Sequence, residues 1–230
     1  MKLGQIIKST DASILIGSEG TEIASICCDS RKAEEGCAFI AVKGYRNDGH
    51  DYIEEAVRNG AVAVIGADRK GLALCADNFY AHPSGKLSLV GITGTNGKTT
   101  TVTMIKEILE NAGKKVLVGG NAGGGFEGYY DLILEAENGD YDVLLVEVCD
   151  MTVGFCSYCF DFDLIALPNM GNDHMNVHGS IENYKNSLKN FFKDKQIVID
   201  KNQIFNDEFK KIAKSTIEYD ASTFDLKLFG

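Results

Sequence analysis

The chain has 230 residues, is 44% hydrophobic and contains only two prolines, so it is long enough for one large or two small domains and is not disordered by composition. Lys and Arg total 23 against 33 Asp and Glu, which gives a net charge of −10 and a pI near 4.9. This balance argues against a surface for nucleic acid or anionic membranes. Because no apolar stretch approaches a membrane span and the N-terminus lacks a signal-peptide core, we expect a cytoplasmic protein.

The first part of the chain, residues 1–82, is expected to form a small mixed α/β domain. Short apolar runs predict strands, and a helix is predicted where Gly60 follows a charged, amphipathic run as its C-terminal stop. The predicted strands lie at 22–28, 37–42 and 61–65, the helix at 51–59, and a linker of turn-forming composition at 77–85.

A glycine-rich segment, Gly91-Ile-Thr-Gly-Thr-Asn-Gly-Lys-Thr-Thr100, lies between a predicted strand at 87–90 and a predicted helix at 101–112. We call residues 91–100 the phosphate loop, because backbone N–H groups in such a turn wrap a phosphate and the helix N-terminus adds partial positive charge. The general pattern expects glycine where this chain has Ile92. A surface turn with a lysine is the alternative. The residues expected to bind ATP are Gly94, Thr95, Asn96, Gly97, Lys98, Thr99 and Thr100, with Lys98 on the β- and γ-phosphates and Thr99 on Mg²⁺.

The rest of the chain, residues 87–230, alternates predicted strands and helices. Near-continuous apolar strands of this kind suit a parallel sheet that is covered on both faces. We therefore expect a doubly wound, mostly parallel α/β domain that binds a nucleotide. Further strands are predicted at 115–118, 142–148, 163–167 and 196–199, and helices at 180–193 and 203–214.

Two groups of polar residues follow predicted strands of this domain. Glu147 stands near the end of an otherwise apolar strand, where an unpaired carboxylate is costly to bury, so a Mg²⁺ ion at the edge of the sheet is its expected partner. An ion pair with a lysine, or a helix cap, is the alternative. The segment 169–178 places Asp173, His174 and His178 in one loop, where they could orient a metal or a nucleotide or merely form a hydrogen-bond network.

Seven cysteines, an odd number, are expected to be reduced thiols. Cys156-Ser-Tyr-Cys159 has the spacing of half a zinc site, and Cys149 could supply a third ligand. Because no second pair of that spacing follows, small buried thiols are the favoured interpretation.

Together, Thr93-Gly-Thr-Asn-Gly-Lys-Thr99, Glu147 and Asn169-x-x-x-Asp-His174 resemble the Mur ligase family of ATP-dependent amide-forming enzymes. The first unit is similar to the UDP-binding domain of the muramyl-tripeptide synthetase branch. The resemblance covers nearly the whole chain. The matching residues of the first unit are Asp29-Ser-Arg31, Phe39-Ile-Ala-Val-Lys-Gly44, Asp48-Gly-His50 and Gly60-Ala-Val-Ala-Val64.

In that family, ATP activates a carboxylate as an acyl phosphate, which the amine of an amino acid attacks. The resemblance implies that Lys98, Glu147 and His174 are catalytic and that Thr99, Glu147 and His174 serve the metal sites. It also implies that the UDP end of a sugar-nucleotide precursor lies among Asp29, Ser30, Arg31, Lys43 and His50. From the residues alone, Asp29-Ser-Arg31 could equally be a turn with an internal ion pair.

Three departures from the family pattern matter. The sequence stops at 224–230, about where the family's Gly-x-His-Asn segment would begin, so the third domain, which brings the amino acid, is expected to be absent. After Glu147 the chain has Cys149, Asp150 and Met151 and no arginine up to residue 173, so the substrate could differ from a muramyl dipeptide. Leu188 stands where many members carry a carbamylated lysine, and we expect no carbamate, with Lys185 and Lys189 as solvated helix charges.

The sequence therefore predicts the UDP-precursor-binding domain, residues 1–82, and the ATP-binding central domain, residues 87–230, of a Mur-type ligase in cell-wall precursor synthesis. One alternative is a Mur-like nucleotide-binding module or partner subunit without complete ligase chemistry. Another is a folate or polyglutamate ligase, which the separate UDP-binding unit disfavours. The amino acid that is added is not set by these residues.

Overall fold

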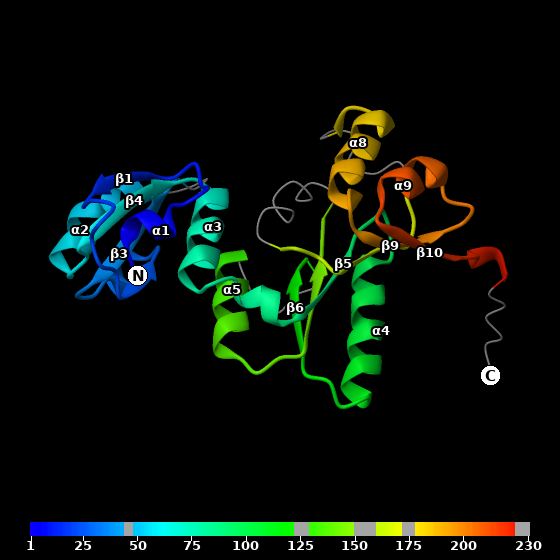
Figure 1. Cartoon of the computed structure of the whole chain (residues 1–230), viewed down its shortest axis with the longest axis horizontal. Helices are drawn as coiled ribbons and strands as arrows, with labels where there is room; N and C mark the ends of the chain where they lie inside the picture. The colour runs from blue at the N-terminus through cyan, green and yellow to red at the C-terminus, as the bar shows by residue number, and fades with distance from the viewer. Residues whose placement is uncertain (44–47, 122–128, 150–159, 172–177, 224–230) are drawn as a thin grey trace. The chain divides into compact units, whose positions relative to one another are not determined.

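The computed structural model describes residues 1–43, 48–121, 129–149, 160–171 and 178–223 (Figure 1). Contacts group the chain into two units, one made of Met1–Pro83 with Tyr129–Asn138 and the other of Ser84–Gly128 with Gly139–Gly230. The helix at 129–138 packs against the helix at 69–79 and belongs to the first unit. From the sequence, residues 87–230 were expected to form the second domain as one continuous segment.

The first unit is built on a four-stranded sheet in the order β1-β4-β3-β2. Strands β2, β3 and β4 are parallel, and β1 runs antiparallel to β4. The elements are α1 (Leu3–Ile6), β1 (Ser13–Ile16), β2 (Ser25–Cys27), η1 (Ser30–Lys32), β3 (Cys37–Val42), η2 (Gly49–Tyr52), α2 (Ile53–Arg58), β4 (Ala63–Ala67), α3 (Arg69–Phe79) and α5 (Tyr129–Asn138).

The core of this unit forms because β3 is apolar throughout and lies between two parallel neighbours. Phe39 of β3 and Val64 of β4 pack with Ala56 of α2, and all three are buried. Helix α3 packs on β3 and β4. Its N-terminus is capped by Asp68, whose Oδ1 accepts a hydrogen bond from Gly71 N at 2.7 Å.

The second unit contains a six-stranded sheet in the order β10-β9-β8-β5-β7-β6, and every pairing in it is parallel. From β5 the chain builds one side of the sheet through β6 and β7, and then crosses to build the other side from β8 to β10. The elements are η3 (Pro83–Lys86), β5 (Ser88–Ile92), α4 (Lys98–Asn111), β6 (Val116–Gly120), β7 (Val143–Glu147), β8 (Leu164–Leu167), α8 (Ile181–Phe192), β9 (Gln196–Asp200), α9 (Asn206–Ile212), β10 (Ser215–Tyr219) and η5 (Ala221–Thr223).

Helices cover this sheet through regularly spaced apolar residues. Helix α4 packs on β5, β6 and β7 through Val102, Ile105 and Leu109. Helices α8 and α9 meet through Phe192 and Phe209, whose rings lie edge to face at 5.1 Å. The expected α/β class with mostly parallel sheets is confirmed.

Several elements were not predicted from the sequence. A linker was expected over 77–85, yet α3 continues to Phe79, and the strands β1 and β10 were not expected at all. Asp, Asn, Pro and Gly give residues 77–85 the composition of a turn, but packing of α3 against α1 and the sheet outweighs that local preference. None of the described helices combines the length and the apolar character needed to cross a membrane.

Candidate functional site

The phosphate loop lies where the order of the sheet reverses. Strand β5 has β7 on one side and β8 on the other, so the carboxyl ends of all three strands meet at one edge. In open parallel sheets, ligands bind in the crevice at this kind of switch point. The sheet order therefore brings the loop after β5, the end of β7 and the residues after β8 together.

Two glycines allow the loop to take its shape. Gly94 has φ +126°, and a Cβ atom there would lie 2.4 Å from the carbonyl oxygen of Asn169. Gly97 has φ +77° and is the N-cap of α4, with no side chain capping the helix. The N–H groups of the first turn are consequently left for an anion, which the helix dipole also favours.

Lys98 lies across the loop that precedes it. Its Nζ donates hydrogen bonds to the carbonyl oxygens of Gly94, at 2.6 Å, and Thr95, at 3.0 Å. The ammonium group is thus held beside the uncapped N-terminus of α4, where positive charge and N–H donors converge. Asn96, Gly97, Thr99 and Thr100 are exposed, so the loop is open to solvent.

Thr99 and Glu147 come together from different elements. The Thr99 hydroxyl, on the first turn of α4, donates to Glu147 Oε2 at 2.8 Å. The Glu147 side chain is buried at the end of β7, and within the described ranges it forms no ion pair with a lysine, arginine or histidine. A hydroxyl and a buried carboxylate are oxygen ligands of the kind that Mg²⁺ takes, so these residues fit such an ion.

Asn169 fixes the phosphate loop, a role that the sequence analysis did not assign. Its Oδ1 accepts from Asn96 N at 2.9 Å, and its Nδ2 donates to Asn96 O at 2.8 Å. The Asn169 carbonyl also accepts from Thr95 N at 3.1 Å, and Gly171 N donates to Thr95 Oγ1 at 2.8 Å. In the sequence, an amide side chain directly after the strand end at Leu167-Pro168 indicates a polar contact at the edge of the sheet. The neighbouring residues do not show that Asn96 is its partner.

Several expected site residues lie outside the part of the chain that the structure describes. These are Asp173 and His174, and also Cys156 and Cys159 of the possible zinc site. His178, at the edge of this gap, stacks on Tyr184 with ring centroids 4.7 Å apart. Among the described residues no cluster of three or more His, Cys, Asp or Glu could hold a metal ion, and Cys149 is buried.

Lys185 is not the solvated helix charge that the sequence analysis expected. Its side chain is only 8% exposed, forms ion pairs with Glu182 at 2.7 Å and Glu208 at 3.2 Å, and lies over the Phe205 ring. Hydrogen bonds from Lys185 to Glu182 and Glu208 raise the pKa of the amine. Because a carbamate forms on a neutral amine, these ion pairs disfavour one at Lys185, and its absence stays a prediction.

In the first unit, Asp29 and Arg31 form the internal ion pair that was considered as an alternative. Arg31 Nε and Nη2 donate to the two oxygens of Asp29 at 2.9 and 2.8 Å, and this hydrogen bonding holds the pKa of Asp29 at about 2. The Arg31 side chain is 80% exposed. A guanidinium has five N–H donors, so the two that face Asp29 leave three for other partners.

The other expected residues of this unit lie in turns around α2. Ser30 is buried, and its hydroxyl donates to Glu55 Oε2 at 2.5 Å, so it joins η1 to α2. His50 lies in η2, and its Nδ1 is 2.6 Å from Asp48 Oδ1. Lys43 is exposed, and its backbone pairs with that of Asp48 in an isolated antiparallel β-bridge. The N–H and the ring of His50 lower the pKa of Asp48.

Comparison with known protein families gives two matches. The family profile described as the Mur ligase middle domain matches residues 92–228, and the one described as the Mur ligase family, catalytic domain, matches residues 22–96. The UDP-N-acetylmuramoyl-L-alanyl-D-glutamate–2,6-diaminopimelate ligase of Clostridium tetani is 32% identical over 99% of this chain and 54% of its own length. The enzyme of that name from Caldanaerobacter subterraneus is 35% identical over 84% of this chain and 46% of its own.

Solved structures show the same fold. MurF from Acinetobacter baumannii superposes with a TM-score of 0.68 at 21% identity, over 93% of this chain and 52% of that one. MurF ligase from Thermotoga maritima, in complex with ADP, gives a TM-score of 0.60 at 24% identity, over 87% of this chain and 51% of that one. The chain spans about half the length of the curated relatives that it matches.

The geometry of the phosphate loop predicts different effects for two glycine substitutions. Gly94→Ala should lower the free energy of unfolding of the second unit by more than about 2 kcal/mol, because both its φ and the Asn169 carbonyl oppose a Cβ. Gly97→Ala should cost only about 1 kcal/mol, since nothing lies within 4 Å of its Cβ and only φ is unfavourable. Urea unfolding followed by circular dichroism measures both, and equal losses would contradict the close approach of Asn169.

Proposed function

Because the chain belongs to the Mur ligase family, we propose that it carries the ATP-binding and precursor-binding units of a ligase that joins a carboxylate to an amine. The observation that carries this proposal is the meeting of Thr99 and the buried Glu147 beside an open phosphate loop. A loop that binds phosphate and an oxygen pair that suits Mg²⁺ are the two parts that a reaction driven by ATP requires.

In the proposed reaction, a carboxylate oxygen of the precursor attacks the γ-phosphorus of ATP, and ADP leaves. The amine of the second substrate then attacks the carbonyl carbon of the acyl phosphate, inorganic phosphate leaves, and the nitrogen loses a proton. Lys98 and the N-terminus of α4 bind the phosphates and stabilise the charge on the oxygens of the transferred group. Mg²⁺ beside Thr99 and Glu147 would supply Lewis acidity and neutralise phosphate charge.

The proposed precursor is a UDP-linked sugar peptide or a similar cell-wall intermediate, bound at its UDP end by the first unit. Three exposed cationic or ionisable side chains support this assignment: Arg31, Lys43 and His50. No arginine lies between residues 147 and 173. A precursor other than the muramoyl peptide for which the relatives are named is therefore also compatible with this proposal.

A second candidate function is a nucleotide-binding module that depends on another polypeptide for the amine substrate. The observation behind it is that the residues assigned to a role, Lys98, Thr99 and Glu147, serve the nucleotide and its metal in either function. Formation of ADP and an amide product by this chain alone would exclude the module, whereas nucleotide binding without turnover would favour it.

We predict that Lys98→Met weakens Mg-ATP binding at least tenfold without changing the fold, because a charge-assisted contact with phosphate is lost and little packing is removed. Isothermal titration calorimetry measures the affinity. Lys106→Met is the matched control, since Lys106 lies in the same helix and its amine forms an ion pair with Glu110 at 2.8 Å. Equal affinity in Lys98→Met and the wild type would refute the assignment of the phosphate loop.

For Glu147→Gln we expect a selective loss of the Mg²⁺ effect. The neutral amide keeps the size of the side chain but removes the charge that attracts the metal, so Mg-ATP affinity should fall about tenfold or more. Binding of ATP in the presence of EDTA should change much less. If both affinities fall in parallel, Glu147 has a structural role only.

Arg31→Ala is expected to weaken binding of a UDP-N-acetylmuramoyl compound about tenfold and to leave ATP affinity unchanged. The loss has two causes, since a cation is removed and the Asp29 carboxylate is left without its partner. Lys32→Ala, in the same turn, is the control. If the wild type binds a folate and not the UDP compound, the folate-type ligase is favoured. If it binds neither, the nucleotide-binding module is favoured.

A further inference from the structure

The residues after β8 connect the phosphate loop to the loop between β9 and α9. On one side Asn169 binds both polar atoms of the Asn96 backbone, as described above. On the other side Gln203 Oε1 accepts from Met170 N at 2.9 Å, and Gln203 Nε2 donates to Met170 O at 3.2 Å. Two consecutive residues, 169 and 170, therefore take part in paired amide–backbone contacts on opposite sides.

The chemistry of these contacts restricts which side chains can make them. To satisfy the N–H and the C=O of one residue together, a side chain needs an acceptor and a donor side by side, and the amides of Asn and Gln carry both on one planar group. Both amides are oriented by their partners, because each oxygen faces an N–H and each nitrogen faces a carbonyl. A glutamate at 203 could keep the first contact but not the second.

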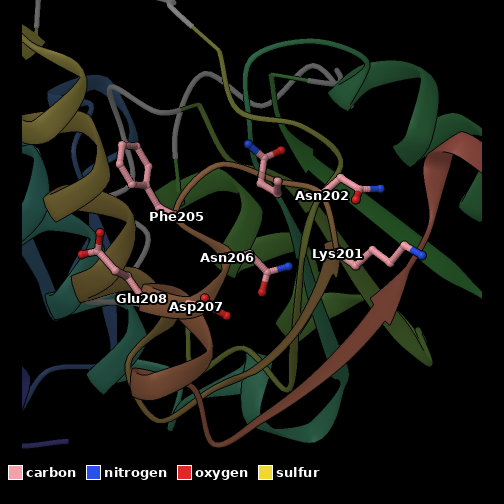
Figure 2. Close-up of a pocket in the computed structure, with 7 residues that line it drawn as sticks. Lys201, Asn202, Phe205, Asn206, Asp207 and Glu208 are labelled. Atoms are coloured by element: carbon pink, nitrogen blue, oxygen red, sulfur yellow. The ribbon is translucent and has the colours of Figure 1, made fainter.

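Gln203 is itself held by its own loop. Its N–H donates to Asp200 O at 2.9 Å, and its carbonyl accepts from Asn206 N at 3.1 Å. Gln203 also lines a cavity of about 420 Å³ in this loop, in which Figure 2 shows Asn206 between Lys201 and Asn202 on one side and Phe205 and Glu208 on the other. The backbone of Gln203 is thus fixed while its amide reaches the residues after β8.

We propose that Gln203 is a positioning residue for nucleotide binding. It fixes the Met170 backbone, which fixes Asn169, which in turn sets the orientation of the Asn96 peptide and of the N–H groups that follow it in the phosphate loop. Its own amide is engaged by the Met170 backbone, so it acts through these residues. The role rests on the proposed function only in so far as the phosphate loop binds ATP, since the chain of hydrogen bonds itself does not depend on a ligand.

The first test is local and needs no ligand. In Gln203→Leu, amide hydrogen exchange at Thr95 and Asn96, both bonded to Asn169, should become about tenfold faster, while exchange in the β5 strand stays unchanged. Gln203→Glu should have a smaller effect. Asn202→Ala is the matched control, because Asn202 lines the same cavity but bonds to Asp220 instead of the residues after β8.

The second test is a double-mutant cycle on Mg-ATP affinity with Gln203→Leu and Asn169→Ala. Gln203→Leu alone should weaken binding about tenfold, and the double variant should bind no more weakly than Asn169→Ala alone, since Gln203 acts through Asn169. Circular dichroism checks folding, and Gln203→Glu replaces Gln203→Leu in the cycle if the leucine variant does not fold.

The outcomes separate the two proposals. Unchanged exchange at Thr95 and Asn96, or additive losses of affinity in the cycle, would overturn the positioning role of Gln203. A wild type that does not bind Mg-ATP would overturn the proposed function instead, and the exchange measurement would still decide the role of Gln203.

Discussion

The phosphate loop must present backbone N–H groups to solvent and still keep one conformation, and the hydrogen bonds between Asn169 and Asn96 meet both demands. An isolated glycine-rich turn would be mobile because glycine restricts the backbone so little. Holding the peptide of Asn96 by its N–H and C=O removes that freedom and leaves the groups at the start of α4 unoccupied. The rest of the site depends on this contact, which itself depends on β8 lying next to β5.

The other neighbour of β5 supplies the acid. Glu147 is paired with Ile92 across β5–β7 and with Gly120 across β6–β7, so the sheet register places its carboxylate beside the first turn of α4. Close approach of β6 requires glycine at 120, where φ is +76° and a Cβ would lie 2.1 Å from Glu147 O. A buried carboxylate is stable there because the Thr99 hydroxyl donates to it, and a divalent cation would compensate its charge further.

The first unit shows a different arrangement of charge. Its expected ligand-binding residues lie in short turns, and several already pair with a neighbour two residues away, as Arg31 does with Asp29 and His50 with Asp48. Such pairs hold the long side chains in one orientation, which would reduce the entropy lost if the proposed ligand binds there. The guanidinium has further donors beyond those that face Asp29, so the ion pair is compatible with the proposed binding of the UDP end.

The sequence by itself determined the α/β class, the phosphate loop and the family, because each rests on a local signal. Apolar runs set the parallel strands, and the order of Gly94, Gly97, Lys98 and Thr99 sets the loop chemistry. Local signals failed where packing outweighed them, as at α3, whose last turn has the composition of a linker.

Only the tertiary structure decided which side chains support the site. Asn169 lies 73 residues from Asn96, and Gln203 lies 33 residues from Met170, so no pattern along the chain could pair them. The burial of Lys185 likewise depends on Glu208, which α9 brings to α8. The physical reason is the same in each case: a polar side chain takes its partner from whichever strand end or helix the sheet order places beside it, and that order is a property of the folded chain.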